Sequence, residues 1–300
     1  MSESVDLLRP KELDDPALTE MLDSRFVVYG DERAMRVYHW FGQFEDNCRF
    51  LARRSKPKVL DLWQQTLMLQ AFPYLPGNSH DYSHEGETLE QWSQGYSLEY
   101  RMLLGAQSVR TAKVALDAVL GGYYTQSLSM CRTLYESYKR MVYARVRPNE
   151  IYRWLSEDMI DEQVKRTEGY HRPSNPPTAA DWKNLFPDNG IANDRANQVH
   201  VQLLGMAQNH MEYLNHHAHP DLEGATDLMN QANGELDRDR LNLAPTFSEM
   251  HLERVMHVDC SALSMLLIET SQYEALPSWW RENHEDCMRR FAVLFTPNAQ

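Results

Sequence analysis

The sequence predicts an all-α protein: a multi-helix bundle with long irregular loops and no significant sheet. Two observations support this fold class. Apolar residues recur at steps of three and four over several long segments, which is the spacing of one helical face. No segment shows a convincing alternation of apolar and polar residues, the pattern of a half-buried strand. We therefore expect more than half of the residues to be helical.

The clearest helical pattern is a hairpin between residues 112 and 147. Gly121 and Gly122 interrupt it, because glycine takes the left-handed conformation that often ends a helix. Pro148 ends the second helix, residues 123–146. The apolar face of that helix is formed by Tyr124, Leu128, Cys131, Tyr135, Tyr138 and Val142. Its remaining surface is predicted to carry Thr125, Ser129, Arg132, Glu136, Lys139, Arg140 and Tyr143.

Other helices are predicted on both sides of this hairpin, bounded by capping residues, prolines or loops. Before it, the expected helices cover residues 15–24, 32–54, 59–72 and 88–120. After it, they cover residues 150–166, 195–216, 248–275 and 279–295. Residues 168–190 carry four prolines and are expected to form a mobile loop or a lid.

A loop rich in Pro, Gly, Ser and His follows the third of these helices. It suggests a division into an N-terminal helical segment, residues 1–80, and a main helical domain, residues 81–300. One continuous domain is the alternative.

Composition narrows the possible functions. The 300-residue chain carries a net charge of −13, which argues against non-specific binding to nucleic acid or to acidic membranes. It has no apolar run of membrane-spanning length, and its start lacks the basic and apolar regions of a signal peptide. Four scattered cysteines without a CxxC pair indicate reduced thiols. We therefore expect a cytoplasmic protein that does not bind membranes.

One polar constellation stands out as a candidate site. Arg132 and Glu136 lie four residues apart and can pair on one helix. Arg132 is at the edge of the apolar face, from which its guanidinium can turn inward. His219 precedes Pro220 at a predicted helix end, where it could act as a general acid/base or bind an anion. We predict a buried Arg132–Glu136 pair within reach of His219 or His216. The alternatives are a solvated charged face and a histidine that only caps its helix.

Other chemistries lack complete motifs. There is no GxSxG sequence, no glycine-rich phosphate loop and no cysteine at an electropositive helix start. Glu212 and His216 could share a metal, but a di-iron bundle needs two ExxH pairs on helices. The only ExxH pair, Glu168 and His171, falls in the proline-rich loop. We expect no metal and no cofactor; a metal-dependent oxidase ranks last.

Two motifs resemble a bacterial family of all-helical proteins without an established activity. The first is Arg-x-Leu-x-Glu after a Gly/Tyr break, and the second is a Tyr-Leu-x(4)-His-Pro corner. The matching residues, within about residues 98–222, are Arg132, Leu134, Glu136, Tyr213, Leu214, His219 and Pro220. That family resembles the HEPN superfamily in its helical pairing. The resemblance implies a bacterial defence or toxin setting and a meeting of Arg132, Glu136 and His219 in space.

Two functions follow as alternatives. The first is a helical binding or accessory protein for an unknown small ligand or protein partner, acting as a monomer or homodimer. The second is a HEPN-like, metal-independent ribonuclease that uses an Arg/His pair. Arg195 and His200 fit the HEPN spacing at a capped helix start, although Ala196 replaces the polar residue usual there. Only this second function would involve nucleic acid.

Overall fold

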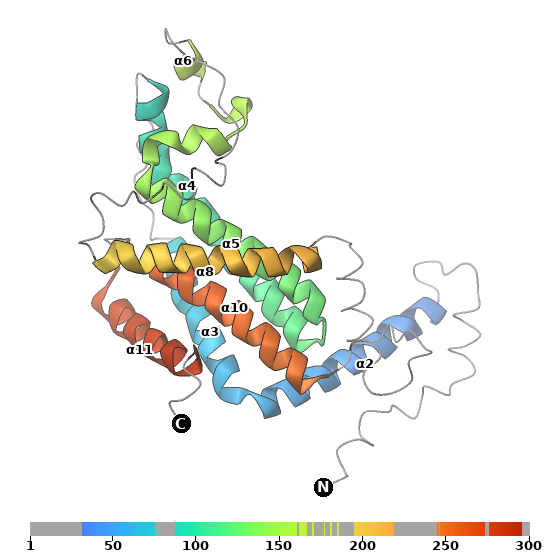
Figure 1. Cartoon of the computed structure of the whole chain (residues 1–300). Helices are drawn as coiled ribbons and strands as arrows, with labels where there is room; N and C mark the ends of the chain where they lie inside the picture. The colour runs from blue at the N-terminus through green and yellow to red at the C-terminus, as the bar shows by residue number, and fades with distance from the viewer. Residues whose placement is uncertain are drawn as a thin grey trace.

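The computed structural model describes residues 32–75, 88–160, 162–166, 195–218, 245, 247–273 and 276–295, with single residues at 170, 177, 181 and 185. Of these residues 88% are helical, and none forms a strand (Figure 1). This confirms the predicted all-α fold. The expected helix at residues 15–24 lies outside the described residues.

The helices are named in chain order. They are α2 Glu32–Ser55, α3 Pro57–Ala71, η3 Phe72–Tyr74, α4 Leu89–Leu120, α5 Tyr124–Val146, η4 Pro148–Trp154, η5 Glu157–Met159, α6 Glu162–Lys165, α8 Arg195–Ala218, α10 Glu249–Thr270 and α11 Ser278–Phe295.

Local sequence signals account for several of these boundaries. Thr88 and Gln91 form a capping box that starts α4, each side chain bonding the other's backbone N–H. Ser248 starts α10 by accepting a hydrogen bond from the backbone N–H of His251. Between α4 and α5, Gly122 has a φ of 84°, a conformation that strains other residues. Helices α4 and α10 thus start within one residue of the predicted positions, 88 and 248.

Residues 150–166 differ from the single helix that was predicted. They form the 3-10 helices η4 and η5 and the short helix α6. Packing explains the difference, because Trp154 stacks on Tyr100 and meets Tyr143 edge-on, with ring centroids 6.1 and 4.6 Å away. Ile151 is fully buried as well. The tight turns of η4 bring both apolar side chains to the core, and this packing outweighs helix propensity.

Helix α5 is the centre of the described structure. It packs against α4, α8, α10 and η4, and Figure 1 shows α8 crossing it. All six residues of its predicted apolar face are buried. Lys139 and Tyr143, predicted on the other face, are buried too. That part of the prediction is wrong, since α8 and η4 cover sides of α5 that an isolated amphipathic helix would expose.

Helix α3 belongs to the same hydrophobic core as the later helices. It packs against α10 and α11, and Leu62 and Trp63 are part of the core cluster. The indole N–H of Trp280 in α11 donates to the carbonyl of Leu69 at 2.9 Å. The predicted division between residues 80 and 81 falls outside the described residues and stays a prediction.

The core also contains a charged cluster that joins α4, α5 and α10. Glu269 is fully buried and accepts hydrogen bonds from Arg145 Nε at 3.0 and 3.2 Å and from an Arg101 Nη at 3.1 Å. The Arg101 guanidinium lies 4.9 Å from the centre of the Tyr273 ring. Buried charges of this kind need both a counter-charge and hydrogen bonds. We call these residues the Glu269 cluster.

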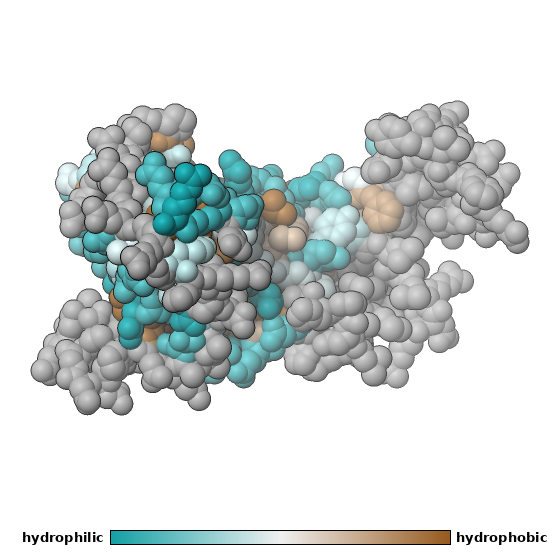
Figure 2. All heavy atoms as spheres, turned by 90° about the horizontal axis from the view of Figure 1, so that it is seen from above, coloured by the Kyte–Doolittle hydropathy of each residue, from teal (hydrophilic) through white to brown (hydrophobic). Residues whose placement is uncertain are grey.

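The described surface is mainly polar on the side seen in Figure 2, where apolar residues form small separate groups. Within the described ranges, no helix combines the length and apolarity needed to cross a bilayer.

Candidate functional site

The Arg132–Glu136 pair lies on the side of α5 that faces α8. Arg132 Nη1 is 3.5 Å from a Glu136 carboxylate oxygen, and Arg132 Nε donates to the Asn215 side-chain oxygen at 2.9 Å. Glu136 also accepts a hydrogen bond from Arg140. The side chains of Arg132 and Glu136 keep 29% and 35% of their surface exposed. The predicted burial is therefore wrong in degree: the pair is half-buried, because α8 covers only one edge of it.

The contact between α5 and α8 continues along both helices. Lys139 Nζ donates to the Gln208 side-chain oxygen at 2.9 Å, and Gln208 Nε2 donates to Glu212 at 3.3 Å. Residue numbers rise along α5 as they fall along α8, so the two helices run antiparallel here. We call this set of residues the α5–α8 seam: Arg132, Glu136, Lys139, Arg140, Gln208, Glu212 and Asn215.

A buried tyrosine links the seam to α10. The hydroxyl of Tyr135 lies 2.5 Å from His210 Nδ1 and 3.0 Å from the carbonyl oxygen of Val258. Because a hydroxyl has one proton and Val258 can only accept, the consistent arrangement has His210 Nδ1–H donating to Tyr135. Burial, reinforced by the nearby His257, lowers the pKa of His210 and favours its neutral form. Tyr135 therefore ties α8 to α10 through uncharged groups.

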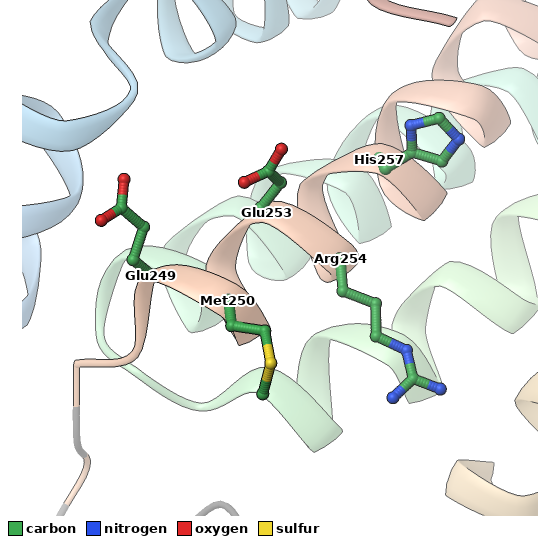
Figure 3. A pocket seen from close by; sticks show the side chains of 5 residues that line it. All are labelled: Glu249, Met250, Glu253, Arg254 and His257. Atoms are coloured by element: carbon green, nitrogen blue, oxygen red, sulfur yellow. The ribbon is translucent and has the colours of Figure 1, made fainter. Parts of the chain in front are cut away.

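A groove of about 640 Å³ runs along the outer side of α10 beside this link. Figure 3 shows its lining: Glu249, Glu253 and His257 point to one side of α10, and Met250 and Arg254 point to the other. The Arg254 guanidinium lies 4.7 Å from the centre of the Tyr213 ring of α8. On the other side of α10, Lys56 Nζ is 3.0 Å from a Glu253 carboxylate oxygen. The acidic and basic side chains that line the groove are thus already in contact with side chains outside α10.

The remaining predicted site residues fall at the limits of the described structure. His219 and Pro220 lie outside the described residues. His216 belongs to α8, immediately after Asn215, but its side chain is not described. Arg195 and His200 lie in the first two turns of α8, again without described side chains. Whether His219 or His216 joins Arg132 stays a prediction, and so does the Arg195–His200 pair.

The roles of Asn215, Tyr135 and Glu269 were not among the predicted ones. A signal exists for Glu269, which follows the apolar run Met265–Ile268 and so places a carboxylate next to the core. No comparable signal exists for Asn215, whose contact with Arg132 joins residues 83 positions apart. Among the described side chains, no group of three His, Cys, Asp or Glu residues is arranged to hold a metal ion.

Comparison with protein-family models, with curated proteins and with solved structures gave no match to this chain.

Proposed function

We propose that this protein is a helical binding protein that recognises an anionic ligand or partner at the α5–α8 seam. One observation carries the proposal: Arg132 is held from two sides and remains accessible. Asn215 fixes its Nε and Glu136 lies beside its Nη1, while 29% of the side chain is exposed. A guanidinium held in this way is prepared for bidentate contact with a carboxylate or phosphate at little cost in side-chain entropy.

The charge of α5 supports an anionic ligand. In a chain of net charge −13, this helix carries four basic residues and a single acidic one, Glu136. Arg145 is neutralised in the Glu269 cluster, and the seam, with Arg132, Lys139 and Arg140 against Glu136 and Glu212, has one basic residue in excess. Local positive charge of this kind attracts anions even when the whole protein is acidic.

The described side chains favour binding over covalent catalysis. All four cysteines are buried, and burial raises the pKa of each thiol, to about 12 for Cys48. Thiolates are therefore disfavoured, and these cysteines are poor nucleophiles. Asn215 and Gln208 offer amide groups that position a ligand and do not exchange protons near neutral pH.

A titration with defined anions tests the proposal. Inorganic phosphate, pyrophosphate and citrate would each be titrated into the wild type, Arg132→Lys and Arg289→Lys by calorimetry. Arg289 is the matched control, because it is an exposed arginine on α11 in an ion pair with Asp286. We expect at least one probe to bind the wild type and Arg289→Lys equally. Arg132→Lys should bind about 10- to 100-fold more weakly, since lysine cannot reproduce the planar fork.

Three results would count against this function. Absence of binding to every probe would remove the anion class, and unchanged binding by Arg132→Lys would remove the site. Cleavage of RNA by the wild type that is lost in His200→Ala would favour the ribonuclease alternative. The cytoplasmic location, the bacterial defence setting and a homodimer remain part of the proposal and rest on the sequence alone.

A further inference from the structure

Asp259 is an acidic residue in the middle of the core, separate from the α5–α8 seam. It lies in α10 and is fully buried. Its Oδ2 is 2.7 Å from Ser127 Oγ of α5. Ser127 Oγ is in turn 3.1 Å from the carbonyl oxygen of Ala115 in α4. One carboxyl group therefore connects three helices through a single hydroxyl.

The surroundings of this carboxyl do not suit a charged group. Its Oδ1 accepts no full hydrogen bond from a described residue, and the Cys131 thiol beside the carboxyl is a weak donor. The titratable groups around it are Cys131 and Tyr135 from α5 and Cys260 of α10 itself, all neutral in the core. No ion pair joins Asp259 to a described Lys, Arg or His. Glu269, which is equally buried, is instead held by two arginines.

The single hydroxyl proton of Ser127 distinguishes the charged from the neutral state of the carboxyl. Ser127 has one hydroxyl proton and two acceptors within reach, Ala115 O and Asp259 Oδ2. If the carboxyl is ionised, Ser127 can satisfy only one of them well. If the carboxyl is protonated, it donates to Ser127 Oγ, and Ser127 donates to Ala115 O. The neutral acid completes the chain of hydrogen bonds and places no charge in the core.

We propose that Asp259 is a neutral carboxylic acid in the folded protein and forms a proton-dependent lock between α4, α5 and α10. Loss of the proton leaves an uncompensated charge at the contact between α5 and α10, so the lock weakens as the pH rises. Burial acts in the same direction, because it raises the pKa of Asp259 from 3.8 to about 7. Mildly acidic solution therefore stabilises the contact between α4, α5 and α10.

The sign of the pH effect follows from linkage. The unfolded chain releases this proton near pH 3.8 and the folded chain near pH 7, so folding takes up a proton between these values. The contribution of Asp259 to stability is thus greatest below about pH 4 and declines as the pH rises through 7. The folding equilibrium constant of the wild type, divided by that of Asp259→Asn, should fall about tenfold from about pH 5 to 6 and less steeply as the pH approaches 7.

Urea unfolding of the full chain at several pH values tests this lock. Asparagine has the shape of the protonated acid and can donate to Ser127. The Asp259→Asn variant should therefore lose the part of the unfolding free energy that depends on protonation of Asp259. Asp286→Asn on α11 is the control, because Asp286 is half-exposed and should leave the wild-type profile unchanged. If the unfolding free energies of the wild type and Asp259→Asn change with pH in the same way, the proposal is overturned.

A second measurement does not depend on the folding of Asp259→Asn. Carbon-13 NMR of wild-type protein labelled at the aspartate carboxyl should show one resonance that titrates near pH 7, well above the others. Ser127→Ala removes the hydroxyl partner and should shift the midpoint of that resonance, which assigns it. If every aspartate resonance titrates below about pH 5, as exposed carboxyls do, Asp259 is ionised at neutral pH and the lock does not exist.

Discussion

Helix α5 carries two arginine–carboxylate networks that differ mainly in their contact with water. Near its carboxyl end, Arg145 binds the fully buried Glu269 together with Arg101 of α4. In its middle, Arg132 pairs with a Glu136 that keeps 35% of its side-chain surface exposed. The same side-chain chemistry is structural in the first case and accessible to a ligand in the second. The difference teaches that an arginine–carboxylate pair is structural or available to a ligand according to its burial, and not because the pair is present.

The largest effect is expected from breaking the buried network. Glu269→Ala leaves the buried Arg101 and the partly buried Arg145 without their carboxylate, which should cost about 3–5 kcal/mol of unfolding free energy. Urea unfolding followed by circular dichroism measures this loss. A change below about 1 kcal/mol would mean that water reaches the cluster, and the contrast between the two networks would disappear.

An intermediate effect is expected at a third ion pair, outside both networks. Arg153 of η4 binds both carboxylate oxygens of Asp181 at 3.0 and 3.1 Å, and Leu185 nearby in sequence is buried. These contacts anchor part of the segment 168–190, which the sequence predicts to be mobile. Asp181→Asn should remove about 1–2 kcal/mol of this anchoring and speed proteolytic cleavage in the segment.

Limited proteolysis of the wild type and the variant, followed by mass spectrometry, would show this effect. Asp158→Asn on η5 is a suitable control, since Asp158 is exposed. Equal cleavage rates for Asp181→Asn and the wild type would show that the Arg153 contact does not hold the segment.

A smaller effect is expected from the accessible network. Glu136→Gln keeps the size of the side chain and removes the charge beside Arg132 and Arg140, so the unfolding free energy should fall by only about 0.2–1 kcal/mol. The change in anion binding should be the larger one, because Arg132 loses its orienting carboxylate. Calorimetric titration with the probe that binds the wild type measures it. If Glu136→Gln loses as much unfolding free energy as Glu269→Ala, the Arg132–Glu136 pair is structural too, and the two networks do not differ.

The smallest effect concerns pH at the edge of the seam. Burial lowers the pKa of His210 in the folded chain below that of the unfolded chain. The neutral imidazole therefore contributes stability above the unfolded value, near pH 6.5, and this contribution is lost as the pH falls. His210→Gln should flatten the decline of melting temperature on the acidic side. An unchanged profile would show that His210 is exposed to water in solution.

Part of the fold could be predicted because its signals are local. The capping box at Thr88, the cap at Ser248 and the glycine break after α4 act within a few residues, so the starts of α4 and α10 and the hairpin turn follow from neighbouring side chains. The predicted end of α10 was too late: the helix stops at Thr270, and Tyr273 beyond it is buried under Arg101. A contact between residues far apart in the sequence therefore set that boundary.

The candidate site could be predicted only in part, for the same reason. The spacing of Arg132 and Glu136 places them one turn apart on any α-helix. In the structure, Arg132 Nη1 lies 3.5 Å from Glu136 Oε2. Their exposure depends on how α8 crosses α5, and the third member, Asn215, comes from a residue 83 positions away. Periodicity within a segment contains no information about that crossing.

By itself, the sequence determined the helical class, the central helix with its buried tyrosines and the pairing of Arg132 with Glu136. These properties depend on spacing and on local backbone chemistry, which act over one or two helical turns. Only the tertiary structure decided which charges are buried. Lys139 and Glu269 are buried, while Arg132 stays accessible, because desolvation is set by neighbouring helices that are distant in the chain.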